Sequence, residues 1–101
     1  ATDPGLTNIL EGNQSMTVYK SIRDEANAAA KLAVALAHGD KNAVKQQTTT
    51  TVKNDVGSVP AILLDPVVVD KSNIADTVIK DGFTTWANIC VGAAKAQCPS
   101  N

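Results

Sequence analysis

The hydrophobic positions of this chain switch between helical and strand-like spacing. Near the start, Leu6, Ile9 and Leu10 fall on one side of a short helical segment. Gly12 follows in the position that commonly ends a helix. The pattern predicts a short amphipathic helix that buries one face.

The next segment, "QSMTVYK", is spaced as a strand. Met16, Val18 and Lys20 point to one side of such a strand, and Thr17 and Tyr19 point to the other. Lys20 therefore stands where the predicted strand ends and the next element begins.

A long alanine-rich segment after Lys20 favours a helix. Ser21 is a suitable N-cap, and Asp24 three residues later resembles a capping box with a shorter acid. His38 in the last turn and Gly39 just after it mark the end, so His38 is interpreted as a capping residue. A stripe of apolar residues, which we expect to pack against a sheet or another helix, consists of Ile22, Ala26, Ala29, Ala33, Leu36 and Ala37.

The second half of the chain returns to strands and then to helices. "TTTTVKN" predicts an edge strand, "DVGS" a turn, and "VPAILLDPVVVD" a strand pair that is interrupted at Pro66 and buried on two sides. Ser72 is expected to cap a helix that Gly82 ends, and "TTWANIC" predicts one or two further helical turns. Strands that alternate with helices indicate an α/β fold.

Composition narrows the possible functions. The 101 residues carry a formal net charge of −1, which gives no electrostatic case for binding nucleic acid or an anionic membrane. The sequence has no run of about 18 apolar residues, so no direct membrane insertion is expected. Three aromatic side chains make a thin core for an independent domain. The chain has no phosphate-binding loop or nucleophile elbow, and its single histidine gives no support for an enzyme, a metal or a cofactor. Structural capping explains the carboxylates of Asp65, Asp70, Asp76 and Asp81.

Cys90 and Cys98 are either two separate thiols or a local disulfide, which we favour and which indicates an extracytoplasmic protein. On a continuous helix the two residues would lie about 12 Å apart along the axis. A disulfide needs Cα atoms within about 7 Å, so the chain must fold back, and Gly92 offers a place for this. Trp86, shortly before, is interpreted as a surface or packing residue.

The blocks "NILEGNQSMTVYKSIRDEANAAAKLAVAL" and "VPAILLDPVVVDKSNIADTVIKDGF" resemble the C-terminal third of bacterial periplasmic D-xylose-binding proteins, the substrate-binding components of sugar ABC transporters. The likeness extends from Ala1 to about Phe83. The tail that contains Cys90 and Cys98 lies beyond it and resembles extensions of some Gram-positive relatives.

The resemblance implies the C-terminal portion of a two-lobe type I periplasmic-binding-protein fold. Residues 1–20 and 66–101 would belong to one lobe and the hinge, and residues 21–65 to the other lobe. Such proteins close over one sugar and present it to a membrane permease without catalysing a reaction. The lysine of "MTVYK" would reach the sugar, so Lys20 is the candidate ligand-binding residue. From the residues alone, the preferred interpretation of Lys20 is an ordinary surface lysine, and the resemblance reverses that preference.

The chain departs from this family at its start. The family strand that precedes this region ends in "GQDA", whose aspartate binds sugar, and Ala1 corresponds to the last residue of that motif. We therefore expect a fragment with part of the sugar site, whose partner is the missing N-terminal portion or a second copy by exchange. The alternative functions are a truncated, self-associating structural module that binds no sugar, and the effector lobe of a sugar-responsive transcription regulator.

Overall fold

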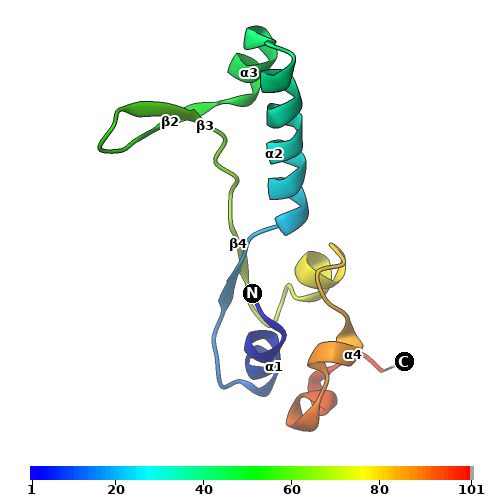
Figure 1. The fold of residues 1–101 in the computed structure, drawn as a ribbon. Coiled ribbons are helices and arrows are strands. Elements are labelled where there is room, and N and C mark those ends of the chain that lie inside the picture. Colours follow the sequence, from blue (N-terminus) through cyan, green and yellow to red (C-terminus); the bar gives the residue numbers. More distant parts are fainter. Residues whose placement is uncertain (101) are drawn as a thin grey trace. The chain divides into compact units, whose positions relative to one another are not determined.

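The chain forms two compact units, each with helices and one two-stranded antiparallel sheet (Figure 1). The computed structural model describes residues 1–100. Unit 1 contains residues 1–20 and the described residues from Pro66 onward, and unit 2 contains Ser21–Asp65. The chain passes from one unit to the other after Lys20 and again after Asp65. The predicted α/β class is confirmed.

Helix α1 (Asp3–Glu11) begins unit 1 and follows the predicted pattern. The Thr2 hydroxyl accepts a hydrogen bond from the Gly5 N–H at 3.3 Å, so one of the free amides of the first turn has a partner. Gly12 ends the helix at a φ of 84°, a left-handed conformation that glycine adopts without a steric penalty. The three apolar residues of the predicted face are buried: Leu6, Ile9 and Leu10.

The sheet of unit 1 pairs β1 (Thr17–Tyr19) with β4 (Val67–Val69). Because side chains alternate along a strand, Tyr19 turns inward and is only 5% exposed, whereas Val18 faces solvent. Val18 lies opposite Val68 in the antiparallel register, and Val68 is exposed as well. The predicted alternation along this strand is therefore present.

The remainder of unit 1 is a series of short helices: the π-helix η1 (Ala75–Ile79), α4 (Trp86–Ile89) and the 3-10 helix η2 (Gly92–Gln97). Helix α1 contacts both α4 and η2. Trp86 is half-buried against the core, as a packing residue would be. The core itself is formed by Leu6, Ile9, Leu10, Tyr19, Val69, Ile74, Val78, Ile89 and Ala94.

The start of the helical segment before η1 differs from the prediction. Ser72 does not cap the segment; instead it donates to the Asp70 carboxylate from its backbone N–H at 2.8 Å and its hydroxyl at 2.6 Å. The Asn73 side-chain oxygen in turn accepts from the Asp70 N–H at 2.9 Å. An aspartate that binds the backbone two residues ahead forms its own turn, and this turn replaces the expected serine cap.

Asp70 provides a pH-dependent contribution to stability. The hydrogen bonds from the Ser72 hydroxyl and backbone lower the pKa of the Asp70 carboxyl. Because this folded-state pKa lies below the ordinary value of about 3.9, the contribution is present above that value and is lost as pH falls through the folded pKa. We expect the urea midpoint to drop between about pH 5 and about pH 2.5, and Asp70→Asn to drop less over that range. Asp76→Asn, which removes an exposed carboxylate from η1, is the control. Equal acid sensitivity of the two variants would contradict this role of Asp70.

Unit 2 begins with the predicted alanine-rich helix α2 (Ile22–Ala37). The Ser21 hydroxyl accepts from the Asp24 N–H at 3.3 Å, and Gly39 follows the helix with a φ of 67°. His38 occupies the C-cap position, as expected.

A further helix, α3 (Lys41–Gln47), was not predicted and packs against α2. The Asp40 carboxylate caps it by accepting from the Ala43 N–H at 2.9 Å. The segment is short and mostly polar, so hydrophobic spacing gives little signal for it.

Strands β2 (Thr50–Lys53) and β3 (Ser58–Ala61) form the sheet of unit 2. The turn between them is held by the Asn54 side-chain oxygen, which accepts from the Val56 and Gly57 N–H groups at 2.9 and 3.0 Å. The chain then leaves strand conformation before β4, so the predicted interruption at Pro66 is present.

Burial in unit 2 differs from the prediction. The expected packing stripe of α2 is exposed, and so are Val59, Leu63 and Leu64 on a segment that we expected to be buried on two sides. Among the described residues, Ala35 is the one buried apolar side chain of this unit. The cause is that unit 2 contains α2, α3 and a single two-stranded ribbon, which supply too little apolar surface to cover these faces.

Candidate functional site

Lys20 directly follows β1, and the strand is fixed by the side chain before it. Tyr19 is buried in unit 1, and its hydroxyl donates a hydrogen bond to the Asp81 carboxylate. Its ring lies against Phe83, with centroids 5.1 Å apart and a tilt of 59° between the planes. These contacts hold the end of β1 in place, so the residue that directly precedes Lys20 is anchored in the core of unit 1.

Lys20 itself is exposed. An ammonium group has three N–H donors and no acceptor, which suits it to the oxygen atoms of hydroxyl groups. The structure therefore places an exposed hydrogen-bond donor directly after the last residue of β1.

A second polar contact lies on the same strand. The ammonium group of Ala1 donates to the Val18 carbonyl at 2.8 Å. This contact joins the segment before α1 to β1, two residues from Lys20. The structure thus fixes β1 through Val18 on one side and through Tyr19 on the other.

Sequence reasoning did not find the contact between Tyr19, Asp81 and Phe83. Asp81 was expected to be a capping residue, and in the structure its carboxylate accepts from Tyr19, 62 residues away. The available signal was the single tyrosine on the inward side of a predicted strand, since a buried Tyr hydroxyl usually has a hydrogen-bond partner. Spacing along the chain does not identify that partner.

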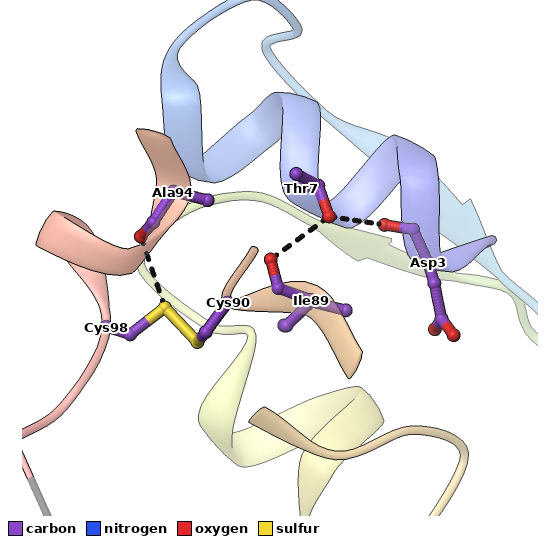
Figure 2. Close-up of a disulfide and its surroundings, with 6 residues drawn as sticks. All are labelled: Asp3, Thr7, Ile89, Cys90, Ala94 and Cys98. Carbon is purple, nitrogen blue, oxygen red and sulfur yellow. Dashed lines mark hydrogen bonds between the residues drawn. A yellow bond between two sulfur atoms is a disulfide. The ribbon is translucent and has the colours of Figure 1, made fainter. Parts of the chain in front are cut away.

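The predicted disulfide joins Cys90 and Cys98, whose Cα atoms are 6.1 Å apart (Figure 2). The chain folds back between them at Gly92, which has a φ of 55°. The Cys98 sulfur lies 3.2 Å from the Ala94 carbonyl oxygen, and because a disulfide sulfur carries no proton we treat this as a packing contact.

The segment before the disulfide is tied to α1 through Thr7. Figure 2 shows the Thr7 hydroxyl between the carbonyl oxygens of Asp3 and Ile89, each 3.0 Å away. A hydroxyl has one proton, so the two carbonyls share it. The bond to Ile89 connects α1 with α4 across 82 residues of sequence.

Within residues 1–100, no group of three or more His, Cys, Asp or Glu side chains is placed to hold a metal ion. The described helices also include none with the length and apolar content needed to cross a membrane. A hollow of about 390 Å³ lies on unit 2 between α2 and α3, but Lys20 does not line it.

The fold matches part of the fold of sugar solute-binding proteins. The chain superposes over 87% of its length, with a TM-score of 0.77 and 31% identity, on the carbohydrate transporter solute-binding protein of Chloroflexus aurantiacus, solved in complex with D-glucose. It covers 25% of that protein.

Within this class, the sequence is similar to D-xylose-binding periplasmic proteins. It is 48% identical to the protein of Haemophilus influenzae over 81 residues and 48% identical to that of Escherichia coli over 79 residues. These matches include 80% and 78% of this chain and 23% of each relative. No protein-family model matches the chain. The resemblance stated from the sequence is confirmed, and the chain spans about a quarter of the length of these relatives.

Proposed function

We propose that the chain is part of the sugar-recognition component of an ABC importer, with D-xylose or a similar aldose as ligand. The observation that carries the proposal is the 48% identity to D-xylose-binding periplasmic proteins over about four fifths of the chain. The function is binding, without a chemical reaction, and the partners are a monosaccharide and a membrane permease. The location is extracytoplasmic, which the Cys90–Cys98 disulfide supports.

The proposal assigns a direct ligand contact to Lys20. The residue is exposed at the end of a strand that Tyr19 holds in place, so a sugar can approach its ammonium group. Units 1 and 2 would be the parts of the two lobes that this chain supplies. Because the chain spans a quarter of its relatives, it would carry part of the sugar site.

The test of Lys20 is a titration of the isotope-labelled chain with D-xylose, followed by amide chemical shifts. We expect shifts centred on Lys20 and its neighbours at millimolar sugar. Lys20→Ala should weaken binding by about 1.5–3 kcal/mol, or roughly ten- to 150-fold, because a hydrogen bond from a charged donor is lost.

Lys95→Ala is the matched control, since it removes another exposed lysine from the same unit. Equal affinity of the wild type and Lys20→Ala would exclude Lys20 from the site. A well-dispersed spectrum that does not respond to D-xylose would favour the alternative, a structural or self-associating module without sugar binding.

A further inference from the structure

The last residue of α1 and the loop that joins α1 to β1 in unit 1 carry the sequence Glu-Gly-Asn-Gln-Ser, residues 11–15 (Figure 1). An asparagine followed two positions later by serine or threonine, with no proline between them, is the acceptor motif of N-glycosylation. Asn13 is the one asparagine of the sequence that stands in this motif. Because so short a motif also arises by chance, the structure around it carries the argument.

The acceptor side chain lies on the surface of unit 1. Asn13 and Ser15 are both exposed, and so are Glu11 and Gly12. The space at the turn is open as well, because a Cβ atom placed on Gly12 would have no heavy atom within 4 Å apart from those of Gly12 and its two chain neighbours. An enzyme is therefore able to reach the Asn13 amide and the Ser15 hydroxyl in the folded unit.

Hydrogen bonds hold the backbone of this loop. The Asn8 carbonyl oxygen accepts from the backbone N–H groups of Asn13 and Gln14 at 2.9 and 3.2 Å. The Gln14 side chain donates to the Met16 carbonyl oxygen at 2.8 Å. These bonds involve backbone groups and the Gln14 amide, so the loop is ordered without using the Asn13 side chain or the Ser15 hydroxyl.

The Asn13 side chain itself lies against a carboxylate. Its Nδ2 atom donates to the Oε2 atom of Glu11 at 3.1 Å. An amide nitrogen carries two hydrogens, so one remains free while Glu11 fixes the direction of the group. A carboxylate that accepts an amide hydrogen also polarises that N–H bond, which raises the electron density on the nitrogen.

We propose that Asn13 is an N-glycosylation site and that Glu11 is a positioning residue for it. The donor is an oligosaccharide that is linked through a diphosphate to a membrane lipid, and an oligosaccharyltransferase catalyses the transfer. The Asn13 Nδ2 atom forms a bond to C1 of the first sugar, and the bond between C1 and the phosphate oxygen breaks. The lipid diphosphate leaves with the electron pair, and Nδ2 loses one proton to a base of the transferase.

The compartment agrees with this modification. N-glycosylation acceptors lie on surface loops of secreted proteins. The Cys90–Cys98 disulfide supports an extracytoplasmic location on separate grounds. The proposal goes beyond sugar recognition, since this glycan is bound covalently to the chain and is not the ligand that the chain recognises.

The test incubates the folded chain, with its disulfide formed, with a purified bacterial oligosaccharyltransferase and a polyprenol-diphosphate-linked oligosaccharide. We expect the intact mass to rise by one glycan and peptide mapping to place that glycan on Asn13. Asn13→Gln and Ser15→Ala should abolish the mass increase, whereas Ser15→Thr should retain it because threonine also carries the hydroxyl. Asn42→Gln, which removes an exposed asparagine outside the motif, is the matched control and should be modified as the wild type is.

Glu11 is tested by two replacements of different charge. Glu11→Gln should lower the initial rate of transfer by at least about tenfold, because a neutral amide is a weaker acceptor than a carboxylate. Glu11→Asp keeps the charge and should retain most of the rate. Equal thermal midpoints of the two variants would place the difference in glycan transfer rather than in folding, and equal rates of transfer to Glu11→Gln and to the wild type would remove Glu11 from the proposal.

Two outcomes would overturn the assignment of Asn13. One is a folded chain that stays unmodified while a synthetic peptide of residues 9–17 is modified in the same reaction. The other is a glycan that persists in Asn13→Gln. Neither outcome depends on D-xylose, so the proposed function is retained or lost on its own titration.

Discussion

Tyr19→Ala is expected to lower the free energy of unfolding of unit 1 by about 3–5 kcal/mol, the usual cost of truncating a buried aromatic side chain. Tyr19 is 5% exposed, lies against Phe83 and donates to Asp81, so the substitution leaves a cavity and removes a hydrogen bond. A domain of this size is stable by about 5–15 kcal/mol in total, so the loss is a large fraction. Urea unfolding followed by the fluorescence of Trp86, which packs against the same core, measures the change.

Tyr19→Phe separates the two contributions. It keeps the ring against Phe83 and removes only the hydrogen bond to Asp81, so we expect a loss of about 1.5–3 kcal/mol. If Tyr19→Ala changed the urea midpoint no more than Tyr19→Phe does, the ring contact would not anchor the end of β1.

Removal of the Cys90–Cys98 disulfide by a double alanine substitution is expected to cost about 2–3 kcal/mol of stability in the chain-entropy model. The cross-link limits the conformations of the unfolded tail, and its loss should lower the thermal midpoint of unit 1. Differential scanning calorimetry with and without reductant provides the measurement.

The double variant also serves as the control for the reductant, because it has no disulfide to reduce. Reductant should lower the midpoint of the wild type toward that of the variant and leave the variant unchanged. A wild-type midpoint that does not respond to full reduction would show that packing of η2 and α4 on α1, rather than the disulfide, holds the tail.

Local signals in the sequence were sufficient to predict the helix ends and turns that neighbouring residues determine. The C-terminal end of α1 follows from Gly12, and the two ends of α2 follow from Ser21 and Gly39. The β2–β3 turn and the fold-back between the cysteines are likewise determined over a few residues.

Contacts and burial that depend on distant parts of the chain were not predictable. The spacing of α2 indicates an apolar face correctly, but it does not say what covers that face, and within unit 2 nothing described does. Asp70 and Ser72 are both good capping residues, and only the observed hydrogen bonds show that the aspartate is the acceptor. Helix α3 has too few apolar residues for its periodicity to be recognised.

The candidate site also has one part that local sequence predicts and one part that it does not. The position of Lys20 at the end of a strand follows from the alternation in "MTVYK", and the structure places it there. The support for that strand end comes from Asp81 and Phe83, more than sixty residues further along the chain. No local pattern links these residues to Tyr19.

The hydrogen bond from Thr7 to Ile89 has a consequence for biosynthesis. The two residues are 82 positions apart, so at about 5–20 residues per second roughly 4–16 s pass between their synthesis. During that interval α1 leaves the ribosome without α4 and η2, which cover its apolar face in the finished protein. The nascent chain therefore presents Leu6, Ile9 and Leu10 to chaperones for several seconds before unit 1 is able to close.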